Sequence, residues 1–65
     1  MDFRADLYGS DRRYQRTERF SADTQDEACE TARRLTVAHG HDHALLYVCD
    51  GNGGATLAAE VGAEQ

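Results

Sequence analysis

Three histidines and an aspartate stand close together in this chain, at His39, His41, Asp42 and His43. Imidazole and carboxylate groups are ligands that zinc uses, and catalytic zinc sites often contain three histidines. Helical spacing places His39 on the inner face of a predicted helix, whereas His41 and His43 fall in the connection after it. The spacing matches no complete zinc site, so we predict no metal and no cofactor here. Zinc-dependent hydrolysis stays a third hypothesis for function.

The string Asp50-Gly51-Asn52-Gly53-Gly54 begins like a calcium-binding loop. Such a loop needs an oxygen-bearing side chain at its fifth position and a glutamate at its twelfth. Those positions hold Gly54 and Val61. Because the string is rich in residues that tolerate positive φ, we interpret it as the turn of a hairpin.

Two cysteines, Cys29 and Cys49, lie on different predicted elements. A catalytic cysteine needs a base beside it and a pocket, and the sequence indicates neither. We therefore predict reduced thiols in a cytoplasmic protein, with a disulfide between two copies left open. The sequence predicts no catalytic residue, so we expect a protein that is not an enzyme.

The element that organises the chain is a helix within about Thr24–His39. Thr24 and Glu27 form a capping box, in which each residue satisfies a backbone N–H near the helix start. Gly40 supplies the residue that most easily closes a helix. The inner face is predicted to hold Ala28, Ala32, Leu35 and His39, with Cys29 and Thr36 on its flank. Leu35 is the large aliphatic residue on this face.

Four short strands surround the helix in the sequence. Residues 2–8 alternate between apolar and polar side chains, which predicts a half-buried strand. Residues 13–20 are poorly patterned and charged, as expected of a sheet edge. A bulge in this strand is left open, and Tyr14 and Phe20 are candidates to point inward.

Residues 44–49 and 55–61 predict a second hairpin after the helix. In the last strand, Leu57, Ala59 and Val61 share one face, and residues 62–65 are predicted to be a frayed tail. The fold class is therefore α+β: one β-β-α-β-β domain over residues 1–65, with a four-stranded antiparallel sheet and the helix packed on one face. The strand order stays open.

The net charge of −5 is unevenly distributed along the chain. Residues 1–20 carry a balance of +1, and residues 21–65 carry −6. Such a charge repels nucleic acid and attracts a protein with a basic surface. The candidate partner-binding residues are Asp23, Asp26, Glu27 and Glu30. The alternative is that these acids serve only the helix, through its dipole and a Glu30–Arg34 pair.

A second candidate surface consists of tyrosines on the sheet face away from the helix. Tyr8 and Tyr47, with Leu45 beside Tyr47, are predicted there, and Tyr14 is a further candidate. Exposed aromatic and apolar patches usually mark interfaces. We therefore expect contact with a partner protein or dimerisation through this face, and leave open whether the chain is a monomer or a homodimer. We expect no membrane association, since the longest apolar run, residues 44–49, is too short to span a bilayer.

In size, acidity and hairpin–helix–hairpin plan, the chain resembles the small acidic anti-CRISPR proteins of phages and mobile elements, especially those acting on type I systems. The resemblance implies a non-enzymatic inhibitor that binds a CRISPR effector complex and blocks target DNA binding, in some cases as a DNA mimic. The arginine-rich first hairpin departs from a uniformly acidic mimic. The alternative function is a small antitoxin-like or regulatory protein-interaction module of bacterial or phage origin.

Overall fold

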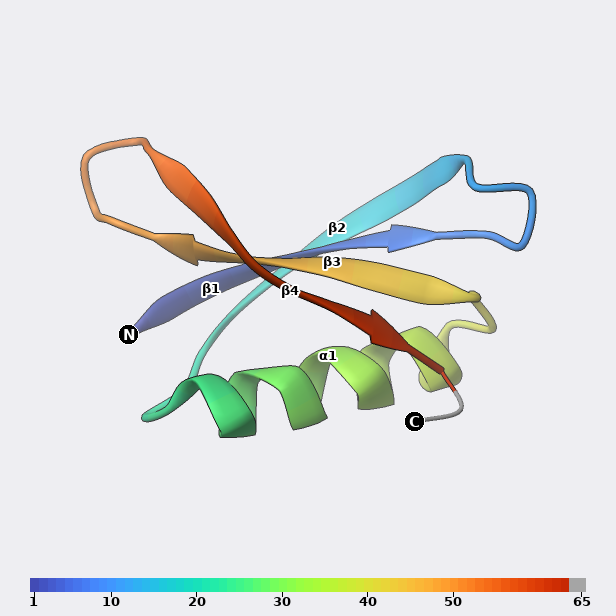
Figure 1. Ribbon diagram of the computed structural model, residues 1–65, viewed down its shortest axis with the longest axis horizontal. Coiled ribbons are helices and arrows are strands. Elements are labelled where there is room, and N and C mark those ends of the chain that lie inside the picture. Colours follow the sequence, from blue (N-terminus) through green and yellow to red (C-terminus); the bar gives the residue numbers. More distant parts are fainter. Residues whose placement is uncertain (64–65) are drawn as a thin grey trace.

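The computed structural model describes residues 1–63 of the chain. Its elements are β1 (Asp2–Tyr8), β2 (Tyr14–Ser21), α1 (Gln25–Ala38), β3 (His43–Cys49) and β4 (Ala55–Gly62). The strands form one antiparallel sheet in the order β2-β1-β3-β4 (Figure 1). The predicted order of elements is confirmed, and β2 lies at a sheet edge as expected.

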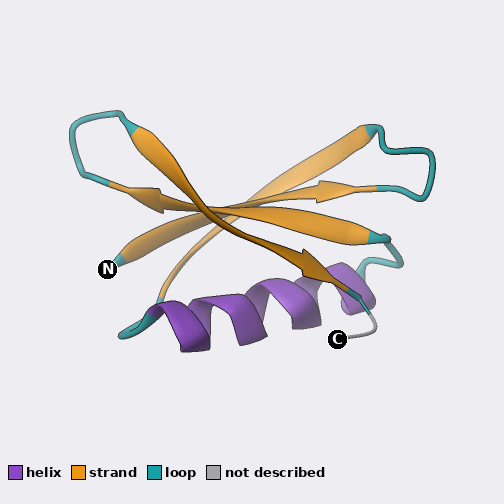
Figure 2. Cartoon of the chain, viewed as in Figure 1, coloured by secondary structure: helices purple, strands orange, loops and turns teal. Residues whose placement is uncertain are grey.

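The helix α1 lies along one face of the sheet, so the described chain has two layers (Figure 2). It contacts β3 and β4 most, and β1 to a smaller extent. The structure therefore confirms a single small α+β domain with its helix on one face. This helix is not long and apolar enough to cross a membrane, and the described residues hold no other helix.

The helix begins and ends as its local sequence predicts. Thr24 is the N-cap, and its side chain accepts a hydrogen bond from the Glu27 N–H. At the other end, Gly40 follows the C-cap His39 with a φ of 71°, a conformation that favours glycine. The buried side chains of α1 are those of Ala28, Ala32 and Thr36.

Two positions of the predicted inner face, Thr36 and His39, were wrong. Thr36, expected on the flank, is fully buried, and its hydroxyl donates to the Ala32 carbonyl oxygen at 2.7 Å. This bond removes the cost of burying an unpaired hydroxyl. His39 is exposed at the C-cap, whereas Leu35 packs against the core as predicted, although it is only half-buried. The helix therefore presents small side chains to the sheet.

The core lies between α1 and the sheet. Eight apolar residues form it, of which four are alanines: Phe3, Ala5, Leu7, Ala28, Ala32, Ala44, Leu46 and Val61. The strand alternation of β1 gives three of them, since Phe3, Ala5 and Leu7 all face α1. So small a core limits the stability that one copy of the chain can reach.

A bulge in β2 reverses the direction of Tyr14. Leu7 pairs with Arg16, but Tyr8 pairs with Tyr14, so Gln15 has no partner of its own. One extra residue moves the following side chain to the other face of the sheet. Tyr14 consequently lies on the face away from α1, which is one of the two faces that the sequence left open for it; the inward placement was wrong. Phe20 does face the core side, where its ring stacks on Phe3 with centroids 6.0 Å apart.

A second bulge lies in β4, where Leu46 pairs with Ala59 and Tyr47 pairs with Leu57. Ala58 is the extra residue, so Leu57 lies on the opposite face from Ala59 and Val61. The predicted shared face of these three residues was therefore wrong.

The end of β4 also differs from the prediction. Gly62 belongs to the strand, and the Ala63 N–H donates to the Asp42 carbonyl oxygen at 3.1 Å. The frayed tail predicted over residues 62–65 was therefore wrong for its first two residues. Glu64 and Gln65 lie outside the described residues.

Candidate protein-binding surfaces

The first candidate surface is the acidic start of α1, and part of its charge is used within the chain. The Glu27 N–H donates to Thr24 Oγ1 at 3.1 Å. In return, a Glu27 carboxylate oxygen accepts from the Asp23 N–H at 3.2 Å, so the capping box reaches one residue before the cap. Glu27 therefore has a structural role in starting the helix.

Glu30 is also engaged within the chain. Its carboxylate is hydrogen-bonded to Arg33 and lies 3.5 Å from Arg34 Nε. The hydrogen bond from Arg33, with the charges of both arginines, lowers the pKa of Glu30 below its ordinary value. The same bond raises the pKa of Arg33. The negative charge of Glu30 is thus offset by two neighbours on its own helix.

Asp23 and Asp26 complete the predicted set. Both are exposed, and neither forms an ion pair with another residue in the described range 1–63. Between the helix and β4 lies an open hollow lined by Asp26, Cys29, Glu30, Arg33, Glu60 and Val61. The acidic surface therefore continues from the helix to Glu60 on β4. We call Asp23, Asp26, Glu27 and Glu30 the acidic helix end.

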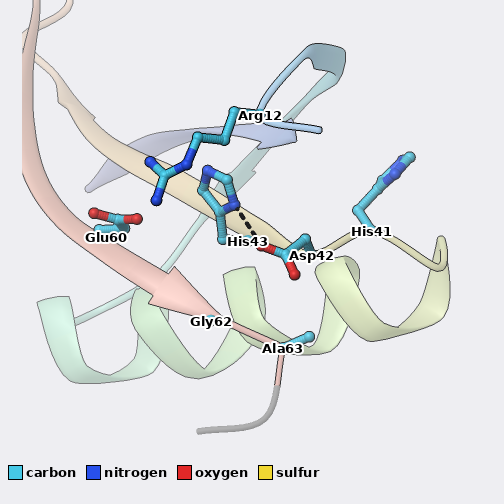
Figure 3. Close-up of a pocket in the computed structure, with 7 residues that line it drawn as sticks. All are labelled: Arg12, His41, Asp42, His43, Glu60, Gly62 and Ala63. Atoms are coloured by element: carbon cyan, nitrogen blue, oxygen red, sulfur yellow. Dashed lines mark hydrogen bonds and ion pairs between the residues drawn. The ribbon is translucent and has the colours of Figure 1, made fainter. Parts of the chain in front are cut away.

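The three histidines do not converge on one point. His39 lies beside Arg16 and Glu18 of β2, with its Nδ1 3.3 Å from an Arg16 nitrogen. The His43 Nδ1 is 2.9 Å from an Asp42 oxygen, and its ring stacks on Tyr8. Figure 3 shows His41 pointing away from His43. Within residues 1–63, no three His, Cys, Asp or Glu side chains are placed to hold a metal ion.

An open hollow at this end of the sheet is lined by charged side chains and backbone (Figure 3). Arg12 reaches toward Glu60 and His43 there, from the turn between β1 and β2. Its φ of 64° is the left-handed conformation that this tight turn requires. The arrangement contains no nucleophile beside a base, so it indicates no particular reaction.

The turn from residue 50 to residue 54 joins β3 to β4, as the sequence predicted. Asp50 accepts hydrogen bonds from the backbone N–H groups of Asn52 at 2.8 Å and Gly54 at 3.0 Å. These bonds lower the pKa of Asp50 below its ordinary value. Gly51 and Gly53 have φ of 84° and 87°, so glycine is required at both positions.

The second candidate surface is the sheet face opposite α1, which we call the open sheet face. Tyr8 and Tyr47 lie on it, as predicted, and Tyr14 joins them through the bulge in β2. Tyr8 and Tyr14 meet edge to face, with centroids 6.1 Å apart. No described residue forms a layer over this face.

The guanidinium of Arg4 lies over the ring of Tyr47, with its Cζ 4.4 Å from the ring centroid. The Nε of Arg4 is 3.3 Å from an Asp6 oxygen. This Nε nevertheless makes no hydrogen bond of normal geometry with any described residue. Asp6 accepts instead from the Thr17 hydroxyl, which is 2.7 Å from the Tyr14 hydroxyl. These contacts fix the side chains at the centre of the open sheet face.

Sequence reasoning missed three residues of this surface. The alternation in residues 2–8 already placed Arg4 on the same face as Tyr8, although Arg4 was not named as part of the candidate surface. Arg19 pairs directly with Arg4, and Leu57 reaches the face through the bulge in β4. Neither position carries a local sequence signal, because both depend on how the strands pair.

No family model matches this chain, and neither the curated proteins nor the solved structures include a significant match to it.

Proposed function

We propose that this chain is a non-enzymatic protein that binds a partner with a basic surface through its acidic helix end. The observation that carries the proposal is the state of Asp23 and Asp26. Both carboxylates are exposed, and neither has an ion-pair partner in the described part of the chain. A basic surface would supply the missing partners, and the balance of −6 in residues 21–65 would speed its approach.

For the partner, we propose the DNA-binding surface of a type I CRISPR effector complex in the host cytoplasm. The support is the resemblance in size, acidity and plan to small anti-CRISPR proteins. Carboxylates that occupy the phosphate-binding positions of such a surface would exclude target DNA by competition. Glu27 and Glu30 contribute less to such mimicry than Asp23 and Asp26, because their charges are already used within the helix.

The test is competition with target DNA for the effector complex. The double variant Asp23→Asn and Asp26→Asn removes two charges and keeps a side-chain oxygen at each position. Its control is Asp2→Asn with Asp11→Asn, which makes the same charge change at two other exposed positions. We expect about a tenfold loss of competition for the first variant at low salt, chiefly through slower association.

Three results would contradict parts of this proposal. If both double variants lose competition equally, the effect is one of net charge, and the acidic helix end is not the contact. If the first variant competes as well as the parent, this surface has no part in binding. If the parent itself never competes, the DNA-mimic mechanism fails.

The alternative function is an antitoxin-like or regulatory module, which the open sheet face favours. A module that acts through another protein needs an uncovered surface with aromatic anchors, and this face supplies Tyr8, Tyr14 and Tyr47. Affinity capture from a host lysate distinguishes the two functions. Recovery of effector subunits supports the inhibitor, whereas recovery of one small protein encoded next to this chain supports the module.

A further inference from the structure

The two edges of the sheet differ in how well they are protected against pairing with another chain. The edge strand β2 carries three charged side chains, Arg16, Glu18 and Arg19. Charged side chains are a usual protection of an edge strand. The other edge strand, β4, carries one charged residue, Glu60, and within residues 1–63 no strand pairs with its outer side. The outer side of β4 is therefore the edge that can accept a further strand.

The hydrogen bonding of β4 shows which backbone groups this edge offers. The Ala63 N–H donates to the carbonyl oxygen of Asp42, which the register of β3 and β4 places directly opposite it. Hydrogen-bonded and non-hydrogen-bonded pairs alternate along an antiparallel ladder. Glu60 and Gly62 consequently occupy non-hydrogen-bonded positions, and their backbone N–H and C=O groups point away from β3.

The bulge at Ala58 limits the part of β4 that can pair in this way. A bulge disrupts the ladder and bends its strand, so it is a natural end for any added pairing. Beyond it, Ala59–Gly62 pairs with β3 in unbroken register. An added strand would therefore lie along this second half of β4.

The flank of α1 beside this half of β4 determines which side chains such a strand can carry. Cys29 and Val61 line the apolar part of the hollow between α1 and β4, and Asp26 and Glu30 line its acidic part. Arg33 also lines the hollow, but it is hydrogen-bonded to Glu30. Side chains that an added strand directs toward α1 would enter this hollow. The stem of an arginine or lysine can lie on its apolar part while the charge approaches Asp26.

The charge at this edge favours a basic segment over a second copy of the chain. Two copies paired along β4 would bring Glu60 and the acidic flank of α1 in one copy close to those of the other, and like charges across such a pairing are destabilising. A basic segment meets opposite charges instead. It is also repelled from the other edge of the sheet, where Arg16 and Arg19 lie.

We propose that an extended segment of the basic partner adds to the sheet as an antiparallel strand along Ala59–Gly62, with its basic side chains in the hollow beside α1. Pairing with the backbone of Glu60 and Gly62 supplies affinity, and the alternate side chains that reach Asp26 supply specificity. The inference rests on the proposed basic partner of the acidic helix end, and it names the element by which that partner binds.

The test uses the full chain and a capped peptide of about eight residues that alternates arginine and threonine, so that all arginines lie on one face of a strand. With the arginines toward α1, the threonine N–H groups of an antiparallel strand face β4. N-methylation of the threonines removes these donors and keeps the charge. N-methylation of the arginines, whose N–H groups face away from β4, is the matched control.

The unmodified peptide should slow amide hydrogen exchange at Glu60 and Gly62, measured by NMR. Methylation of the threonines should weaken binding about tenfold, because the outward carbonyl groups of β4 lose their donors. Methylation of the arginines should leave the affinity unchanged.

A change in the chain tests the same pairing. Gly62→Pro removes one outward N–H, and proline is tolerated on an edge strand where its nitrogen faces away from the ladder. Gly62→Ala keeps the N–H and is the control. We expect about tenfold weaker peptide binding for the proline variant alone. If far-ultraviolet circular dichroism shows that Gly62→Pro does not fold, the two methylated peptides test the pairing on the parent chain.

The proposal is overturned if the unmodified peptide does not bind at millimolar concentration, or if it binds without slowing exchange at Glu60 and Gly62. It is equally overturned if the two methylated peptides bind alike. Slower exchange at these amides on concentrating the chain alone would assign the edge to a second copy. These results are separate from the proposed function, which fails when the parent never competes with target DNA, whatever the peptide does.

Discussion

Replacing Leu46 by alanine should remove much of the stability of this domain. Leu46 is fully buried in β3, and its register partners are Ala5 on β1 and Ala59 on β4. These two methyl groups cannot reach into the space that the leucine leaves, so a cavity should persist. Leucine-to-alanine changes in cores cost about 2.7–5 kcal/mol, and a persistent cavity gives the larger values. We therefore expect a loss of about 3–5 kcal/mol.

The expected loss is large when it is compared with the total free energy of unfolding of so small a domain. A single core in a chain of this length supplies at most about 3–5 kcal/mol of net stability. Urea unfolding, followed by circular dichroism, should therefore show Leu46→Ala largely unfolded or with a midpoint near zero denaturant.

Leu35→Ala is the matched comparison, since it makes the same chemical change on the half-buried side of α1. We expect it to cost about 1–2 kcal/mol, because part of that side chain is already in contact with water. If Leu35→Ala costs as much as Leu46→Ala, the placement of the core between small helix residues and the central strands is refuted.

Three further changes test the caps, the turn and the histidines. Thr24→Ala should cost about 1 kcal/mol in urea unfolding, because the Glu27 N–H loses its acceptor, whereas Thr31→Ala should cost less. The pKa of Asp50 is lowered in the folded state, so its contribution is present above its ordinary pKa and is lost as the pH falls through the folded value. Asp50→Asn should therefore flatten the loss of stability between about pH 5 and pH 2; an unchanged acid profile contradicts this. Calorimetry should show no sub-micromolar zinc site, and a site that disappears in His41→Ala would overturn this prediction.

The helix and the number of strands were predictable because their signals are local. The capping box needs only Thr24 and Glu27, and the alternation of residues 2–8 needs no knowledge of a partner strand. Even the ion pairs of Glu30 follow from spacing, although the sequence indicated Arg34 and the structure adds the closer Arg33.

The composition of the open sheet face was not predictable in the same way. The bulges at Gln15 and Ala58 depend on how each edge strand pairs with its neighbour. A shift of one residue reverses every side chain beyond it. The sequence therefore left Tyr14 a candidate for both faces, and it grouped Leu57 with residues of the opposite face. The opposition of Arg4 and Arg19 likewise comes from register between strands, which the sequence leaves undetermined.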